Sequence, residues 1–248
     1  MTIPKIIHYC WFGSNDIPES VARCIESWKK YCPEYTIMRW DEKSFDVSAY
    51  KFTSEAYKKR KWAFVSDFAR LKVVDEYGGF YLDTDVELLR SLDPLTKLRG
   101  FMGLESFDCI ASGLCFGAEK GNKHIKALLD IYRNFDYQEI SCGKITTTYF
   151  RTIGFQYKNT IQELDHFHIF PTEYFCPQLP GTRKIRTTEN TYSVHYYNAS
   201  WFSEKGLTKE IKYRRIFINM IIKKFLLIIV GQQTFEKLTN NVDISCDA

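Results

Sequence analysis

The stretch WAFVSDFARLKVVDEYGGFYLDTDVELL, residues 62–89, decides the fold. Apolar residues such as Phe68 and Leu71 recur at helical spacing through its first half, which predicts a helix. The paired glycines at 78–79 follow the last periodic residue and are typical of a helix end. Residues 80–82 are all apolar and predict a short buried strand. A helix that stops abruptly and leads into a buried strand indicates an α/β domain.

Two aspartates, Asp83 and Asp85, follow this strand with one residue between them. Open α/β sheets bind ligands beyond the carboxyl ends of their strands. Mg²⁺ and Mn²⁺ prefer a few carboxylate oxygens and complete their shells with water and phosphate. The alternative is that both aspartates are turn residues that hydrogen-bond to their own chain. The buried strand and the double glycine before the pair favour a metal site.

A charged pair, Asp67 and Arg70, interrupts the apolar helix one turn apart. One interpretation is a surface ion pair that contributes little to stability. However, apolar residues surround both positions and leave little room for a solvated face. A partly buried pair that faces the same cleft as the two aspartates would suit a sugar hydroxyl and a phosphate.

These residues together form the pattern S-D-x-x-R-x-x-x-L/V-x-x-x-G-G-x-Y-x-D-x-D, which resembles the core of glycosyltransferase family 32. That family includes yeast Golgi mannosyltransferases and many bacterial capsule and lipopolysaccharide sugar transferases, and it is similar to the clostridial glucosylating toxins. The resemblance implies a GT-A type fold, with a Rossmann-like mixed sheet flanked by helices. The matching positions are Ser66, Asp67, Arg70, Gly78, Gly79, Tyr81, Asp83 and Asp85.

The resemblance also implies how the substrates are held. It assigns Mn²⁺ (or Mg²⁺) to Asp83, Asp85 and His195, and it implies a UDP-sugar as the donor. The residues that it assigns to catalysis are Asp67, Arg70, Asp83 and Asp85. The residues that it assigns to the nucleotide sugar are Trp11, Asp67, Arg70, Tyr81, Asp83 and Trp201.

The amino-terminal segment predicts the first half of the sheet. Residues 5–11 indicate a buried strand, residues 18–30 an amphipathic helix and residues 35–40 a second strand. Similar family members open with I-P-K-I-I-H-x-x-W-F-G, in which the tryptophan stacks on the nucleotide base, and Trp11 matches it. A core tryptophan at the end of a strand is the alternative. His8 would face away from Trp11, which predicts a hydrogen-bonded histidine in the core.

Further strands are predicted at residues 101–105 and 110–118, and a helix at residues 120–135. Family members often carry an acidic residue near Glu105, which is therefore a candidate for the acceptor side. Residues 141–146 are similar to a family loop but lack its proline.

His195 is followed six residues later by Trp201. In similar family chains this segment folds over the diphosphate and contributes to the metal shell. Imidazole nitrogen is an acceptable Mn²⁺ ligand, and an indole N–H can donate to a phosphate oxygen. Without the resemblance, His195 would be interpreted as a hydrogen-bonded histidine in a strand.

Composition narrows the class of protein. The chain has 248 residues with 45% hydrophobic content, which is enough for one domain with a sizeable core. Its formal charge of +4 gives no reason to expect nucleic acid as a partner. The eight cysteines show no C-x-x-C pair, and the opening residues lack the features of a signal peptide. We therefore expect reduced thiols and a cytoplasmic protein.

We expect the chain to consist of a catalytic domain over residues 1–205 and a helical tail over residues 206–248. Within the tail, Lys212, Arg215 and Lys223 recur at helical spacing among apolar residues. The longest uncharged run falls short of the roughly 20 residues that a spanning helix requires. A basic helix on an anionic bilayer and a core-packing helix both fit this pattern.

The function expected is a metal-dependent transfer of a hexose, galactose or glucose before mannose, from a nucleotide sugar to a saccharide hydroxyl. The acceptor would be linked to a polyprenyl diphosphate in surface polysaccharide synthesis, and the resemblance implies retention of anomeric configuration. Two rivals remain. One is a phosphatase of the haloacid dehalogenase type, which also uses a D-x-D at a strand end. The other is a non-catalytic membrane assembly factor that binds sugar nucleotides.

Overall fold

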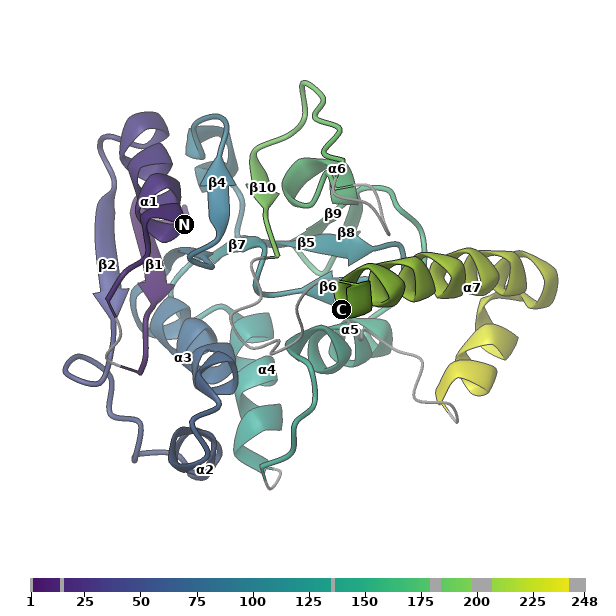
Figure 1. The fold of residues 1–248 in the computed structure, drawn as a ribbon, viewed down its shortest axis with the longest axis horizontal. Helices are drawn as coiled ribbons and strands as arrows, with labels where there is room; N and C mark the ends of the chain where they lie inside the picture. Colours follow the sequence, from purple (N-terminus) through teal and green to yellow (C-terminus); the bar gives the residue numbers. More distant parts are fainter. Residues whose placement is uncertain (1, 14–15, 135–136, 179–183, 198–206, 241–248) are drawn as a thin grey trace.

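The computed structural model describes the chain except residues 1, 14–15, 135–136, 179–183, 198–206 and 241–248. A mixed sheet of eight strands forms its centre, with helices on both faces (Figure 1). A second sheet of two strands lies on one side of the first. The strands are β1 Ile6–Cys10, β2 Thr36–Trp40, β3 Gly79–Leu82, β4 Val86–Leu88, β5 Gly100–Ser106, β6 Cys109–Ala111, β7 Cys115–Ala118, β8 Gln162–Leu164, β9 Phe167–Phe170 and β10 Ser193–His195. The helices are α1 Glu19–Tyr31, α2 Lys51–Lys58, α3 Trp62–Tyr77, a 3₁₀ turn Asp93–Lys97, α4 Lys123–Asn134, α5 Cys142–Thr152, α6 Thr172–Phe175 and α7 Leu207–Asn240.

The order of strands in the large sheet is β2-β1-β3-β7-β5-β9-β8, and β6 pairs with β5. Strand β1 lies between β2 and β3 and runs parallel to both, whereas β7 is antiparallel to its two neighbours. The chain therefore reverses its direction of winding at β1, and such a switch point opens a crevice at the carboxyl edge of the sheet. Trp11 follows β1 and Asp83 follows β3, so both lie at this edge.

Helix α3 is the central helix of the fold and confirms the prediction for residues 62–77. Eight of its residues are buried, because α3 packs on the sheet with α2 and α4 beside it. The helix ends at Gly78, whose φ of 68° is a left-handed conformation that glycine adopts without strain. One apolar cluster forms on the face covered by α2, α3, α4 and α5, and another on the face covered by α1, α6 and β4.

His8 confirms the prediction of a hydrogen-bonded core histidine. Its side chain is fully buried, and its Nδ1 accepts a hydrogen bond from Trp40 Nε1 at 3.1 Å. Nε2 must then carry the proton, and it donates to the carbonyl of Gly78 at 2.8 Å. Burial lowers the pKa of His8 to about 4, so the ring is neutral at pH 7.

Two predictions of local structure were wrong. Residues 110–118 form two strands, β6 and β7, because residues 112–114 turn the chain between them. Residues 141–146 open helix α5 instead of forming a loop, because the Ser141 side chain accepts a hydrogen bond from the Lys144 backbone N–H and caps the helix.

Helix α7 lies along the domain and extends beyond it (Figure 1). A break at Gly231, with φ of 72°, separates its long first part from its last turns. Phe235, after the break, is buried and contacts the ring of Tyr157 at a centroid distance of 5.4 Å. The described part of the tail is therefore helical and packs on the domain, while the boundary near residue 205 stays a prediction.

Candidate active site

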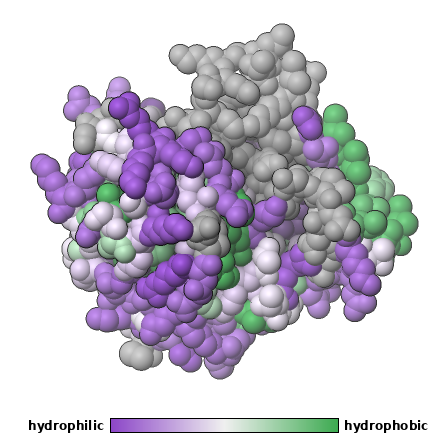
Figure 2. All heavy atoms as spheres, turned by 90° about the horizontal axis from the view of Figure 1, so that it is seen from below, coloured by the Kyte–Doolittle hydropathy of each residue, from purple (hydrophilic) through white to green (hydrophobic). Residues whose placement is uncertain are grey.

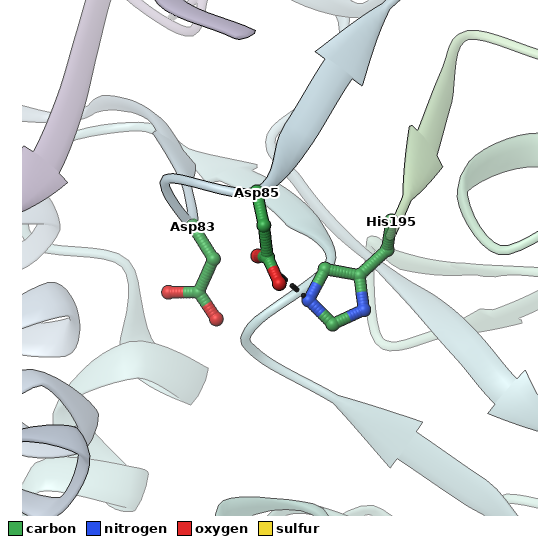
Figure 3. A group of neighbouring side chains, drawn as sticks. All are labelled: Asp83, Asp85 and His195. Atoms are coloured by element: carbon green, nitrogen blue, oxygen red, sulfur yellow. Dashed lines mark ion pairs between the residues drawn. The ribbon is translucent and has the colours of Figure 1, made fainter. Parts of the chain in front are cut away.

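The turn between β3 and β4 carries Asp83 and Asp85. The Val86 N–H donates to the Asp83 carbonyl at 3.0 Å, which closes the turn and places both carboxylates on one side (Figure 3). Strand β10 pairs with β4 in antiparallel register, and His195 lies opposite Val86. This pairing brings His195 next to Asp85 across 110 residues of sequence.

The three side chains converge closely enough to share one ion. A candidate ligand atom from each of Asp83, Asp85 and His195 lies within 4.8 Å of the other two. His195 Nε2 is 3.0 Å from Asp85 Oδ1, and His195 Nδ1 is buried without a hydrogen-bond partner among the described residues. Burial alone lowers the pKa of His195, but the carboxylates of Asp85, Asp83 and Glu105 together outweigh it and the pKa is raised. A divalent cation that bound Nε2 would therefore have to displace a proton.

The donor set fits Mn²⁺ or Mg²⁺. Two carboxylates and one imidazole are acceptable ligands for Mn²⁺, and their placement on one side leaves other positions for water and phosphate oxygens. The assignment of these three residues to a metal stays a prediction, which their mutual distances support.

Arg70 holds Asp83 in place from helix α3. Its Nη2 lies 3.1 Å from Asp67 Oδ1 and 3.1 Å from Asp83 Oδ1, and its guanidinium covers the ring of Tyr81 at 4.9 Å. The Tyr81 hydroxyl donates to the same Asp83 oxygen at 2.9 Å. Arg70 is only 3% exposed, so water screens these ion pairs little. Asp83 is thus oriented by one ion pair and one hydrogen bond.

Asp67 is buried and pairs with the same Arg70 nitrogen, Nη2, as Asp83 does. Burial raises the pKa of Asp67 to about 6, although the Arg70 charge acts in the opposite direction. Burial likewise raises the pKa of Asp83, again against the effect of Arg70. Besides its pairs with Asp67 and Asp83, Arg70 donates from Nε to the Ser66 carbonyl at 3.2 Å and from Nη1 to Cys142 Sγ at 4.0 Å. Direct contact of Asp67, Arg70 and Tyr81 with a donor sugar or phosphate stays a prediction.

Gly113, in the turn between β6 and β7, approaches Asp83 more closely than any side chain would allow. A Cβ at this position would lie 2.5 Å from Asp83 Oδ2 and 3.0 Å from Arg70 Nη1. The structure shows that the close approach is to the Asp83 carboxylate.

Comparison with known proteins agrees with this geometry. Residues 18–101 match the family model described as a glycosyltransferase sugar-binding region containing a DXD motif. This chain carries the DXD sugar-binding region of glycosyltransferases. The matched range includes α3, β3 and both aspartates of the turn, which confirms the resemblance found in the sequence.

Curated relatives of this DXD region are yeast enzymes. The chain is 32% identical over 136 residues to inositol phosphoceramide mannosyltransferase 3 of Schizosaccharomyces pombe, covering 53% of this chain and 37% of that protein. It is 31% identical over 104 residues to mannosyl phosphorylinositol ceramide synthase CSH1 of Saccharomyces cerevisiae, covering 40% and 27% respectively. The chain thus spans about a third of the length of the curated relatives it matches.

A solved structure shares the fold. The PaToxG glycosyltransferase superposes with a TM-score of 0.51 at 19% identity, over 61% of this chain and 69% of that one. The sheet flanked by helices and the carboxyl-terminal helix confirm the expected fold class of the GT-A type.

The remaining predicted residues lie around the DXD turn or outside the described part. Trp11 is half-buried at the end of β1, where its backbone N–H donates to the Trp40 carbonyl at 2.8 Å. Its stacking on a base stays a prediction. Trp201 lies outside the described residues.

Two residues near His195 extend the site toward β5. The ring of Tyr197 lies 4.2 Å from the His195 ring, and its hydroxyl makes a hydrogen bond with Cys176 Sγ at 2.8 Å. Burial raises the pKa of Tyr197, and the nearby Glu105 charge raises it further. Burial raises the pKa of Glu105, against the nearby His195 charge. Sequence reasoning named Glu105 but missed Tyr197. Strand alternation could not have found it, because Tyr197 lies beyond the end of β10 and has a φ of 49°.

Proposed function

We propose that this chain transfers a hexose from a nucleoside diphosphate sugar to a saccharide hydroxyl, with Mn²⁺ or Mg²⁺ held by Asp83, Asp85 and His195. The observation that carries the proposal is the convergence of these three side chains within 4.8 Å, inside and beside the matched DXD region. When bound, the cation supplies positive charge next to the diphosphate of the leaving nucleotide.

Other residues of the chain would orient Asp83, bind the donor and face the acceptor. Arg70 and Tyr81 orient Asp83 through the bonds described above, so that its carboxylate is already placed when the donor arrives. Trp11, at the same edge of the sheet, would stack on the nucleotide base, and Asp67 would accept a hydrogen bond from a donor hydroxyl. Glu105 and Tyr197 lie on the β5 side, where an acceptor hydroxyl would enter. We assign no protein nucleophile.

The proposal also concerns which sugar and which nucleotide make up the donor. The sequence favoured UDP-galactose or UDP-glucose before GDP-mannose, whereas the names of the curated relatives support mannose as the sugar. We propose a saccharide acceptor linked to a polyprenyl diphosphate, surface polysaccharide synthesis as the setting, and the cytoplasmic side of the membrane as the location.

A donor screen tests the proposal without knowledge of the acceptor. UDP- and GDP-sugars are incubated with the full chain and Mn²⁺, and slow nucleotide release identifies the donor. Asp85→Asn should lower this release by at least a hundredfold, because it removes a charge beside the diphosphate. Asp130→Asn is the matched control, since Asp130 pairs with Arg133 on an exposed surface.

Two outcomes would assign the chain to its rivals. Phosphate release from p-nitrophenyl phosphate without any sugar nucleotide would indicate a phosphatase. Thermal stabilisation by a nucleotide with Mn²⁺, but no release from any donor, would indicate a non-catalytic binding protein. An active Asp85→Asn variant would remove the role assigned to that carboxylate.

A further inference from the structure

Helix α7 presents a continuous apolar stripe away from the domain. Its members are spaced by three or four residues or are adjacent, so they share one face of the helix. Figure 2 shows strongly hydrophobic residues gathered at one edge of the molecule. The stripe consists of Ile218, Ile221, Ile222, Phe225, Ile228 and Ile229, which are 37–77% exposed.

The opposite side of α7 is fixed to the domain. Met220, Leu227 and Val230 pack against the core cluster beneath the sheet. Lys223 Nζ lies 3.0 Å from Asp108 Oδ2, and the two side chains are only 14% and 11% exposed. The domain therefore determines which face of α7 points outward. The prediction that Lys223 belongs to a bilayer-facing stripe was therefore wrong, because Lys223 points toward the domain and forms an ion pair with Asp108. The side chain of Lys212 lies outside the described part.

The charges around the stripe indicate what covers it. The segment 211–235 contains no Asp or Glu. Its basic residues are Lys212, Arg214, Arg215, Lys223 and Lys224. Arg215 and Lys224 are exposed, and at about 100° per residue they fall on opposite borders of the stripe, each roughly 80–100° from Phe225. Apolar residues bordered by cations with long aliphatic stems match the boundary between the acyl chains and anionic headgroups of a bilayer.

Other occupants fit less well. A second copy of the chain would bring two acid-free basic borders together, and like charges that face each other across an interface are unfavourable. The segment Ile218–Phe235 is apolar and long enough to cross a membrane by length and composition alone. However, Lys223 within it is paired with Asp108, and Gly231 breaks the helix. Crossing would require α7 to leave the domain.

We propose that α7 lies in the plane of an anionic lipid bilayer, with its apolar stripe inserted and its opposite side still docked on the domain. This inference concerns a binding surface and stands independently of the catalytic proposal. It also positions the site. Asp108 lies in the turn after β5, and Glu105 on that strand is close enough for the charges of both Asp108 and His195 to act on its pKa. The docked helix therefore lies beside the end of β5 that carries Glu105, and on the proposed function, in which Glu105 faces the acceptor, this places the membrane beside the acceptor side.

Vesicle sedimentation tests the proposal with the full chain. We expect binding to vesicles of phosphatidylcholine and phosphatidylglycerol in equal parts, and at least tenfold weaker binding to phosphatidylcholine alone. The double substitution Ile222→Glu with Phe225→Glu should reduce binding to the anionic vesicles at least tenfold. Ile161→Glu is the matched control, since Ile161 is an equally exposed isoleucine on another part of the molecule, at 51%. Lys224→Gln should weaken binding roughly fivefold.

Three results would overturn the proposal. The first is equal vesicle binding by the stripe variant and the wild-type chain, with matching circular dichroism spectra. The second is absence of vesicle binding together with a dimer in analytical ultracentrifugation that the stripe variant abolishes, which would assign the stripe to a second copy. The third is resistance of the membrane-bound chain to extraction by alkaline carbonate, which would indicate a spanning helix.

Discussion

The substitution Gly113→Ala tests how accurately Asp83 must be placed. The added Cβ would lie 2.5 Å from Asp83 Oδ2, whereas ordinary contacts begin near 3.4 Å, so the carboxylate must move by about 0.9 Å. Asp83 cannot make this shift freely, because its Oδ1 is bonded to Arg70 at 3.1 Å and to the Tyr81 hydroxyl at 2.9 Å. The substitution therefore acts on the site through a methyl group on a neighbouring turn.

The expected loss follows from the size of the displacement. A misplacement of about 1 Å in a catalytic constellation can lower the rate roughly a hundredfold, which corresponds to about 2.7 kcal/mol of transition-state stabilisation. Stability should also fall, by about 1–3 kcal/mol as at other overpacked sites, although alanine meets no backbone strain there because Gly113 does not have a left-handed φ. The loss of activity and the change in Mn²⁺ requirement are what distinguish this substitution from overpacking elsewhere.

The assay measures Mn²⁺-dependent nucleotide release and the concentration of Mn²⁺ at half-maximal rate, with the melting temperature measured in parallel. Gly103→Ala is the control, since its Cβ would lie 2.8 Å from the Phe175 ring in the apolar core. It should lower the melting temperature, because overpacking a core destabilises a protein by about 1–3 kcal/mol, and it should leave the Mn²⁺ dependence unchanged. Release by Gly113→Ala within twofold of wild type, at an unchanged Mn²⁺ requirement, would refute the reasoning.

Three further predictions follow from buried charges. His8 has a pKa of about 4 when folded and 6.5 when unfolded, so the unfolded chain binds more protons between these values and stability falls as the pH falls through this window. Urea denaturation from pH 7 to pH 4 should show a loss of roughly 3 kcal/mol that His8→Gln removes. Arg70→Lys should lower nucleotide release at least tenfold and the free energy of unfolding by about 2 kcal/mol, because lysine lacks the planar guanidinium that contacts two carboxylates at once. Arg99→Lys is the control: Arg99 pairs with Glu119 and is half-exposed, so stability should change by less than about 0.5 kcal/mol. A double-mutant cycle of Lys223→Ala and Asp108→Ala should give a coupling of about 1–2 kcal/mol in urea unfolding, because both side chains are largely buried.

Each of these has a result that contradicts it. An acid loss of the same size in wild type and His8→Gln would show that other groups titrate on unfolding. Full activity in Arg70→Lys would mean that Tyr81 alone orients Asp83. A coupling near zero between Lys223 and Asp108 would mean that apolar contacts alone dock α7.

The local structure of the site could be predicted from sequence where its signals are short in range. The helical period before Gly78, the double glycine and the apolar residues 80–82 predicted α3 and β3 correctly, because each signal lies within one turn or one strand of its effect. The placement of Asp83 at a strand end followed from the same stretch. Burial of Asp67 and Arg70 was also expected, since apolar residues surround both positions in the sequence.

The contacts that assemble the site could not be predicted in this way. His195 reaches Asp85 only because β10 pairs with β4, and no periodicity in the sequence specifies that register. Gly113 reaches Asp83 through a turn that the sequence pattern merged into one strand. The pairing of Lys223 with Asp108 reversed the expected role of a helical lysine, because helical spacing shows which residues share a face but not what that face meets.

The charges of the site explain why a cation and the donor would bind together. Asp67, Asp83 and Asp85 supply three carboxylates, and Arg70 supplies a fixed positive charge that two of them already share. A diphosphate approaching this turn would meet excess negative charge in a region where burial already disfavours the ionised forms of Asp67 and Asp83. Arg70 cannot relieve that repulsion, because it is 3% exposed and its guanidinium faces inward to the carboxylates. His195, whose pKa is raised, contributes part of the missing positive charge. An ion bound beside Asp83 and Asp85 would supply the rest, and weak binding of UDP or GDP without Mn²⁺ is the expected consequence.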